Sequence, residues 1–482
     1  MTPLVSKETR TILTRRIKGF LDEFFHNKIG LVGLALLFMF VGTAIFAPWL
    51  SPYDPITAPR VAGKFAVPSW LTVFPQYKEY SSTMEVRPYW EVNETSEYAN
   101  IQWGRSLVVN VNMSEEPKQG TVTLTADFSY LYNMPPEAFT LSFDLSTHNI
   151  TNLWYSTKIS LTNPQNNSTL IWSEPYTDQN MQSSVNAEST DYWLLRKLGY
   201  LDPTTTNIAT LIFPQPTKGN YTLTFELSFR PTEDATSAGA TLAIKNALFY
   251  IPGRSHGILG TDFLGTDVWT QLVHGTRISL VIGLLAAAIS TSIGVLLGVL
   301  AGYSGGAVDE TLMRLVDILI CLPVLPLLLI LVKLFGKNVF YIVLFIALFG
   351  WTGLSRVIRS QVLSIREAAF VESAVAAGAG RYYVMIKHIV PNVFPIALAS
   401  LVLSVPGAIL AEAGLSFLGF GDPRVPTWGK MLNYAFGHGA FENFAWWWTV
   451  PPGLAITLIS LTFVFMGYAI DEIVNPRLRR RR

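Results

Sequence analysis

The chain has 482 residues, of which 50% are apolar and only 14% are charged, with a formal net charge of +1 and a mean hydropathy of +0.33. A soluble domain is about one quarter charged, so this composition excludes an ordinary soluble protein and indicates a membrane protein. The single cysteine, Cys321, excludes a disulfide framework, and no feature of the charge calls for a nucleic-acid partner.

Six apolar stretches each come close to the roughly 20 residues that cross a bilayer. They cover residues 29–50, 278–301, 318–332, 339–355, 389–411 and 444–470. The third and fourth are short, and the third contains Pro323 and Pro326, which neighbouring helices would have to accommodate. A buried helix of a soluble core is the alternative for either. We predict an α-helical polytopic membrane protein with six transmembrane helices.

Lys and Arg gather at both ends of the chain, and the cytoplasmic flanks of spans retain such residues. They lie in the arm 1–28 before the first span and in the tail 471–482 after the last. Both termini are therefore expected in the cytoplasm, as an even number of spans requires. Residues 29–50 are expected to be a retained anchor rather than a cleaved signal sequence, which makes this a multi-pass protein of the cell membrane.

About 200 residues of different character separate the first two spans, in the range 51–257. Apolar and polar residues alternate there in TVTLTADFSY, FTLSFDLS, YSTKISL, YTLTFELSF and TLAIKNALFY, and turn-rich pieces separate these runs. The alternation predicts antiparallel strands with one wet face. We therefore expect an inserted all-β, sandwich-like extracellular domain.

Charge and sequons also set this domain apart. Positions 54 to 267 hold 21 acidic and 13 basic residues, a net charge of −8, whereas the rest of the chain carries +9. An acidic exterior suits either a solvated surface or a basic partner. Every N-x-[S/T] sequon falls in this domain, and these candidate glycosylation sites are Asn93, Asn112, Asn149, Asn166, Asn167 and Asn220.

The segment FVESAVAAGAG, residues 370–380, is rich in small side chains and carries one carboxylate, Glu372. Helix formers run to Gly378, a Gly-Ala-Gly break follows, and a second amphipathic segment is expected to end at Pro391. A short helix of this kind is marginal alone, whereas its small side chains would let a partner approach the backbone closely. The segment is either received by a partner groove or is a surface helix at the membrane boundary.

Several charges stand beside apolar segments. Arg314 lies four residues after Glu310 and three before Asp317, so the three can share one helix face. They are either a structural ion-pair cluster or part of a substrate pathway. Glu412, at the outer end of the fifth stretch, either lines the pathway or reaches the interface. No histidine has a companion at ligand spacing, so we expect no metal site.

VESAVAAG followed by HIVPN resembles the cytoplasmic EAA loop of ABC importer permeases, which couples to the ATPase. The positions that match its Glu-Ala-Ala triplet, its glycine and its apolar ending are Glu372, Ser373, Ala374, Gly378, Ile389, Val390 and Pro391. Ser373 in place of Ala and Val390 in place of Leu are departures from the family pattern. The earlier Glu367 to Ala369 spells the same triplet but lacks a glycine at the required distance.

Further segments resemble one branch of that superfamily, the C-type permease of dipeptide and oligopeptide importers. They are APWLSPYDP, LGTDFLGTDVWTQLVHGTRISL, AGYSGGAVDETLMRLVDILICLP, AILAEAGLSFLGFGDP, PTWGKML and NPRLR. The resemblance implies a type I importer fold, with a five-helix permease core at 258–470 and a coupling loop at 356–388. It leaves out roughly residues 60–254, since ordinary members have a short linker there. The large insertion is similar to that of some archaeal members.

The resemblance implies a non-catalytic permease subunit that forms half of a peptide translocation pathway. Because the chain has no G-x-x-x-x-G-K-[ST] phosphate loop, ATP and Mg²⁺ are expected on partner subunits and no cofactor on this chain. The implied partners are a second homologous permease, two cytoplasmic ATPase subunits, an extracellular substrate-binding protein and the lipid bilayer. Residues 372–378 would sit in a cleft of one ATPase.

Two alternatives stay open. The same architecture would serve an importer of oligosaccharides or metal chelates, because the external binding protein largely selects the cargo. In a different class, the outer domain would be a membrane-anchored carbohydrate-binding or hydrolytic module, which predicts a catalytic carboxylate pair and an aromatic platform. A lone anchor, however, would not need six spans.

Overall fold

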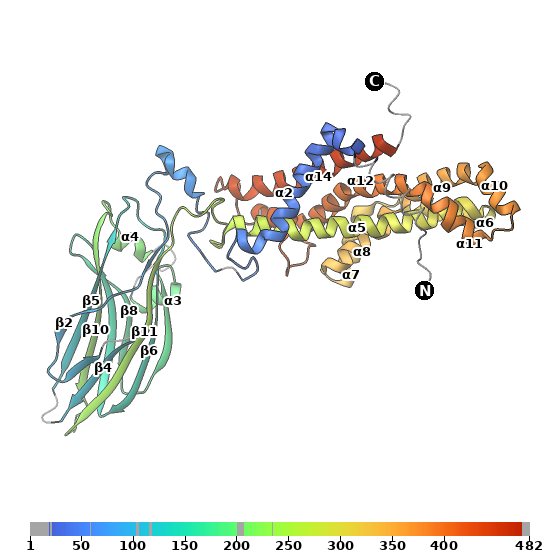
Figure 1. Ribbon diagram of the computed structural model, residues 1–482. Coiled ribbons are helices and arrows are strands. Elements are labelled where there is room, and N and C mark those ends of the chain that lie inside the picture. The colour runs from blue at the N-terminus through green and yellow to red at the C-terminus, as the bar shows by residue number, and fades with distance from the viewer. Residues whose placement is uncertain are drawn as a thin grey trace, which may run out of the picture. The chain divides into compact units, whose positions relative to one another are not determined.

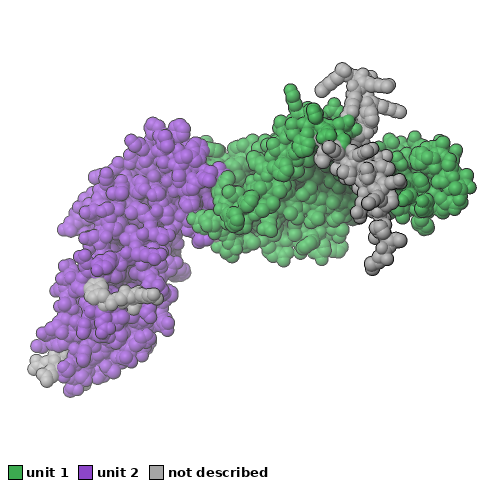
Figure 2. Space-filling model, viewed as in Figure 1, with its two compact units in different colours: residues 1–58, 268–482 green, residues 59–267 purple. Residues whose placement is uncertain are grey.

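The computed structural model describes residues 19, 22–57, 59–102, 106–114, 118–199, 207–233 and 235–474. The chain divides into two compact units, residues 59–267 and the remainder, 1–58 with 268–482 (Figures 1 and 2). The basic arm before Gly19 and the tail after Val474, on which the orientation was predicted, lie outside the described residues. The unit made of residues 1–58 and 268–482 consists of helices, and the unit made of residues 59–267 is built mainly of strands.

The inserted unit is an antiparallel sandwich, and all five strands predicted from alternation are present. One sheet has the order β3-β4-β11-β6-β9, with β1 also pairing with β11, and the other has the order β2-β5-β10-β7-β8. Their bounds are β1 Met84–Val86, β2 Glu91–Thr95, β3 Ala99–Gln102, β4 Ser106–Met113, β5 Gly120–Tyr130, β6 Thr140–Thr151, β7 Leu153–Thr162, β8 Ser168–Thr177, β9 Gln182–Glu188, β10 Gly219–Pro231 and β11 Ala238–Ile251. Two short helices, α3 Tyr192–Lys197 and α4 Ile208–Ile212, follow β9.

The core of this unit lies between the inner faces of the two sheets. Along β5, alternate side chains from Val122 to Tyr130 are buried while the residues between them are more exposed. This period of two is what a strand with one buried face requires. One apolar cluster joins both sheets through residues such as Leu124 and Phe225 from one sheet and Phe143 and Phe249 from the other.

The unit extends to Asp267, beyond the predicted limit at 257, because the segment after β11 pairs with the segment before β1. Phe65 N–H donates to Asp262 O at 2.9 Å, Thr261 N–H to Ala66 O at 2.9 Å, and Val61 N–H to Gly265 O at 2.9 Å. Entry and exit of the chain are thus fastened together at one end of the sandwich. Two 3₁₀ turns, η1 Ser69–Val73 and η2 Pro75–Tyr77, belong to the same segment.

The helical unit has four described helices long and apolar enough to cross a membrane. They are α2 Lys28–Leu50, α5 Val268–Ser304, the continuous helix Arg381–Phe417, and α14, Trp446–Val474, whose qualifying stretch is Trp446–Ile473. Two bent helix pairs pass the same test together, so by length and composition the described residues hold four to six candidate spans. A shorter helix, α13 Trp428–Gly437, precedes α14.

The predicted third span is not one straight helix. Helix α6, Gly306–Cys321, and helix α7, Val324–Phe335, meet at an angle of 89°. The break falls at Leu322 and Pro323, where proline lacks the N–H that would continue the ladder and disfavours a helical conformation of the residue before it. The fourth predicted span is likewise a pair, α8 Val339–Gly350 and α9 Thr352–Arg366, bent by 41°.

Helices α5 and α9 approach each other closely along a stripe of glycines. A Cβ placed on Gly294 would lie 3.1 Å from Trp351 O, one on Gly298 would lie 2.7 Å from Ser355 O, and one on Gly302 would lie 2.9 Å from Arg359 O. The glycines recur every four residues and therefore share one face of α5. Their missing side chains let the two backbones touch, as in other small-residue helix contacts in membranes.

Candidate coupling site

The Glu-Ser-Ala triplet lies inside a short helix, α10, Ala369–Ala376. Glu372 is exposed in its first turn, where a carboxylate is favoured by the helix dipole. Ser373 is also exposed, and its Oγ donates to Ala369 O at 2.7 Å. The Glu-Ala-Ala sequence at residues 367–369 does not lie within one helix, because Glu367 is the C-cap of α9 and Ala369 is the first residue of α10. The sequence-based choice of triplet therefore coincides with the one that forms a helix.

Gly378 terminates α10 through a left-handed backbone conformation with φ of +87°. Its N–H donates to Val375 O at 2.9 Å, and the N–H of Ala379 donates to Ala374 O at 3.1 Å. This pair of bonds is the Schellman motif, which needs a residue that tolerates positive φ. Apart from the glycine and its chain neighbours, no atom of the described residues lies within 4 Å of the position that a Cβ would take at Gly378. The glycine is thus required by the backbone, and the space beside it is open.

Helix α10 is fixed to the helical unit by Val371, whose side chain is 2% exposed. Val371 belongs to an apolar cluster that joins α5, α9 and the long helix, with Ile358, Val362 and Ile389 as fully buried members. Its neighbour Phe370 is 47% exposed and Val375 is 51% exposed. The helix therefore anchors one face in the core and leaves apolar side chains on its free face.

A pocket of about 570 Å³ opens beside α10. It is lined by Tyr303, Ser304, Arg366, Val371, Glu372, Val375, Ala376 and Arg381. The lining combines carboxylate, guanidinium and small apolar groups, a mixture that suits a protein surface better than an apolar small molecule. Figure 1 shows α10 and α11, Arg381–Val384, at one end of the helical unit, the end at which α9 also finishes.

The second amphipathic segment does not end at Pro391, contrary to the prediction. Helix α11 continues through a π-helical turn, η3 Met385–Ile389, into α12, Val390–Phe417, so that a 37-residue helix runs from Arg381 to Phe417. The N–H of Val390 donates to Met385 O, five residues back, and Pro391 falls in the first turn of α12. The helix continues past this proline directly after the π-helical turn, which changes the hydrogen-bond register. Ile389 is fully buried.

Ion pairs tie α6 to α9. Arg359 donates to both oxygens of Asp309, at 2.5 Å and 2.6 Å, and Arg356 pairs with Asp317. Arg314 pairs with Glu310 at 3.6 Å, on the shared face expected from their spacing, but Asp317 pairs across to α9 instead. Sequence reasoning missed Asp309, Arg356 and Arg359, because local spacing carries no signal for pairs some 40 to 50 residues apart.

Glu412 is buried in α12, with 2% of its surface exposed, and so does not reach the interface. Its Oε1 accepts a hydrogen bond from Ser416 Oγ at 2.6 Å. It also does not line the pocket of about 320 Å³ between α5, α7, α8 and α12. Of the two predicted roles, interface contact is wrong, and a pathway role stays a prediction.

A second buried carboxylate, Asp422, holds the start of α8 to the loop after α12. Burial disfavours its ionised form, but hydrogen bonds from the Arg424 guanidinium and backbone N–H, each at 3.0 Å, and from Val339 N–H at 3.1 Å act more strongly. Together they hold the pKa of Asp422 below its usual value. Sequence reasoning did not single out this residue.

All six sequon asparagines have exposed side chains, so each is accessible to a modifying enzyme. They lie on strands or turns of the sandwich: Asn93 in β2, Asn112 in β4, Asn149 in β6, Asn220 in β10, and Asn166 with Asn167 in the turn before β8. Across the described part of the chain, no cluster of three His, Cys, Asp or Glu side chains could hold a metal ion.

Comparison with known proteins connects the helical unit to transporters. Residues 294–480 match the family model described as binding-protein-dependent transport system inner membrane component. Residues 16–64 match the N-terminal TM domain of oligopeptide transport permease C. The first match contains α10 and all the residues of the coupling site, whereas most of the sandwich lies between the two matches.

Individual relatives agree with the family models. A putative peptide permease of Brucella suis is 39% identical over 219 residues, 45% of this chain and 72% of the relative. A dipeptide transport system permease of Bacillus subtilis is 36% identical over 231 residues, 48% and 72% of the two chains. An oligopeptide transport system permease of Haemophilus influenzae is 37% identical over 228 residues, 47% and 72% of the two chains.

Solved structures add little. A carbohydrate-binding module solved with beta-1,4-galactotriose aligns with 34% of this chain and 88% of its own, at 11% identity and a TM-score of 0.19, which is too low to bear on ligand or function. The assignment rests on the family model and on the relatives. The alignment with this chain covers 72% of the length of each of these three relatives. The chain therefore belongs to the binding-protein-dependent transport system inner membrane components, the multi-pass permease subunits of ABC transporters.

Proposed function

We propose that this chain is a permease subunit of an ATP-driven importer of dipeptides or oligopeptides and forms half of its translocation pathway. The observation that carries the proposal is α10: a short helix fixed by Val371, closed by Gly378 and bearing exposed Glu372 and Val375 beside an open pocket. The named peptide permeases among its relatives favour peptides over oligosaccharides or metal chelates as cargo.

The site would receive force from an ATPase subunit. Its candidate contact residues are those of the predicted coupling set: Glu372, Ser373, Ala374, Gly378, Ile389 and Pro391. The exposed members Glu372, Ser373 and Gly378 would touch the ATPase, whereas Ile389 is buried and would act by shaping the support of α10. Pro391 is exposed in the first turn of α12. Small side chains around Gly378 would let the partner surface approach the backbone.

Force would reach the spans through rigid contacts. Helix α10 follows α9 after two residues, α9 touches α5 along the glycine stripe, and Arg359 fastens α9 to α6 through Asp309. Val371 packs in the cluster that includes Ile389 and Val393 of the long helix. A displacement of α10 would therefore move these helices together, and two such arrangements would give alternating access.

The remaining components follow from the family. ATP and Mg²⁺ would bind two cytoplasmic ATPase subunits, a second homologous permease would complete the pathway, and an external binding protein would deliver the cargo. The termini and α10 would lie in the cytoplasm and the sandwich outside the cell. The sandwich would serve as a scaffold for the binding protein, a role in keeping with its acidic surface if the binding protein presents a basic one.

Reconstitution tests the cargo. The chain, its partner permease, the ATPases and the binding protein would be placed in liposomes, and ATP hydrolysis would be measured with matched panels of peptides and oligosaccharides. We expect stimulation by peptides. Stimulation by oligosaccharides alone would reject the peptide assignment, while the assignment as an importer permease would still hold. A variant without residues 60–254 that still docks the binding protein with unchanged affinity would reject the scaffold role.

A further inference from the structure

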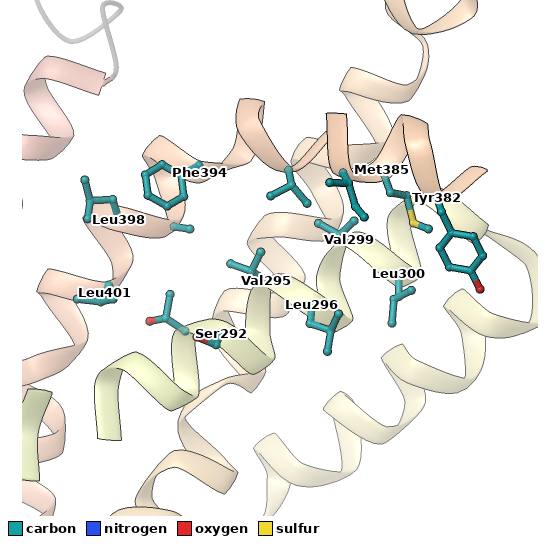
Figure 3. Close-up of a pocket in the computed structure, with 14 residues that line it drawn as sticks. Ser292, Val295, Leu296, Val299, Leu300, Tyr382, Met385, Phe394, Leu398 and Leu401 are labelled. Atoms are coloured by element: carbon teal, nitrogen blue, oxygen red, sulfur yellow. The ribbon is translucent and has the colours of Figure 1, made fainter. Parts of the chain in front are cut away.

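A long apolar groove runs between α5 and the continuous helix from α11 to α12. Its volume is about 510 Å³, and Figure 3 shows side chains from the two helices facing each other across it. The lining is Thr291, Ser292, Val295, Leu296, Val299, Leu300, Tyr382, Met385, Ile386, Val390, Phe394, Ala397, Leu398 and Leu401. This groove shares no lining residue with the pocket beside α10, although Arg381 of that pocket is the neighbour of Tyr382 in the chain.

Large apolar side chains on the groove remain exposed. Leu296 is 60% exposed, Ile386 70% and Phe394 60%. At the deep end, Ser292 Oγ donates to Ala288 O at 2.8 Å, so that hydroxyl is already bonded within its own helix. The groove therefore exposes apolar side chains along its length, and an apolar ligand would bury them.

The length of the groove fits one leaflet of a bilayer. On α5 the lining runs over ten residues, from Thr291 to Leu300, a rise of about 14 Å at roughly 1.5 Å per step. This is about half of the roughly 30 Å hydrocarbon core. Both walls belong to helices that are long and apolar enough to span the membrane. An acyl chain lying parallel to α5 would thus fit between them.

Basic residues flank the lining at the other end of the groove. Tyr382, with 78% of its surface exposed, belongs to the lining there. Arg381 precedes it in the chain, Lys387 follows the lining residue Ile386, and both cations are exposed. Neither cation forms an ion pair with a carboxylate among the described residues. Two such cations and a phenol hydroxyl at the mouth of an apolar groove match the phosphate and the acyl chain of one anionic phospholipid.

We propose that this groove binds one acyl chain of an anionic phospholipid and that Arg381, Lys387 and the Tyr382 hydroxyl hold its headgroup. The lipid belongs to the cytoplasmic leaflet, an assignment that rests on the orientation given under the proposed function. The headgroup lies where the chain passes from α10 into α12, so the lipid stiffens the connection between the ATPase contact and the spans.

The test is native mass spectrometry of the purified full-length chain with phosphatidylglycerol and phosphatidylcholine of identical acyl chains. We expect one phosphatidylglycerol to be retained preferentially. Arg381→Gln and Lys387→Gln should each weaken that preference about five-fold, the factor expected for one basic side chain at an anionic surface. Ser292→Phe, at the end of the groove away from Tyr382, should displace both lipids by filling the groove.

Arg314→Gln is the matched control, since it removes an exposed cation of α6 that does not line the groove. Equal retention of both lipids, or a preference unchanged in the Arg381→Gln, Lys387→Gln double variant, would overturn the proposal. So would loss of the bound lipid on adding the partner permease, because the groove would then be a subunit interface. The lipid measurement needs no ATPase or peptide. It can therefore fail while the peptide assay succeeds, and the peptide assay can fail while the lipid measurement succeeds.

Discussion

Arg359 donates hydrogen bonds to both carboxylate oxygens of Asp309, from Nε to Oδ1 at 2.5 Å and from Nη2 to Oδ2 at 2.6 Å. These bonds link α9 to α6. The Asp309 side chain is only 15% exposed, and the pair is bidentate, the geometry in which arginine is superior to lysine. This contact lies on the route by which a displacement of α10 would reach the bundle.

Replacing Arg359 by Lys should lower the stability of the helical unit. The ammonium group cannot donate to both oxygens in the same geometry, and hydrogen bonds to charged groups contribute about 1.5–3 kcal/mol. Thermal unfolding of the detergent-solubilised chain measures the effect. Arg314→Lys is the control, because the Arg314–Glu310 pair is about three quarters exposed and should contribute less than about 1 kcal/mol. Equal losses in the two variants would contradict the assigned role of Arg359.

Gly378→Leu should uncouple ATP hydrolysis from uptake without preventing membrane insertion. The substitution forces a branched side chain into φ of +87°, at a cost of about 1–3 kcal/mol, and also fills the open space beside α10. Gly380→Leu serves as control, since Gly380 has φ of −69° and open space as well. Gly378→Asn, which tolerates positive φ, should retain more coupling than Gly378→Leu. Undiminished uptake by Gly378→Leu in proteoliposomes would remove the coupling assignment.

Val371→Ala should loosen α10 from its support. The change removes two buried methyl groups, worth about 1.5 kcal/mol, while the exposed backbone of α10 stays as it is. We expect faster amide hydrogen exchange in residues 369–376 together with weaker coupling. Val375→Ala, at a side chain 51% exposed, should leave the exchange rates unchanged. If the exchange of α10 does not change in Val371→Ala, the valine is not the anchor.

Gly298→Val should separate α5 from α9. A Cβ at this position would lie 2.7 Å from Ser355 O, a backbone atom that cannot move aside, and such overpacking costs about 1–3 kcal/mol. Gly353→Val, on α9 where no atom lies within 4 Å of a Cβ, controls for the change of residue type. Cross-linking or spin-label distances between the two helices report the separation. A distance unchanged from that of the Gly353 variant would show that the stripe does not set the packing.

Asp422 should make the stability of the helical unit depend on pH in the acid range. Its pKa in the folded protein lies below the usual value, so its contribution is complete above the unfolded pKa near 4 and is lost as the pH falls through the folded pKa. Unfolding temperatures measured from pH 7 to pH 3 should fall less steeply in Asp422→Asn than in the unaltered chain. Parallel curves would mean that the Arg424 and Val339 contacts do not favour the carboxylate.

The sequence by itself determined the apolar helices and the main strands. Alternation along β5 or β10 follows from burial of one face of a strand, which leaves a period of two in the sequence. The runs of α2 and α14 are recognised instead by continuous apolar residues over a length that can cross a membrane. The short helix around Glu372 was also within reach, because its cap glycine follows from local backbone geometry and its triplet resembles a family motif.

Only the tertiary structure decided how these elements combine. The strand order of the two sheets, the Asp309–Arg359 clamp, the burial of Val371 and the 89° break before α7 all involve residues far apart in the chain or angles that no local pattern encodes. The helix that continues past Pro391 shows the same limit, because a proline favours an ending in one context and a first turn in another. The choice follows from the π turn before it and from the packing of Ile389, both of which exist only after the helices have assembled.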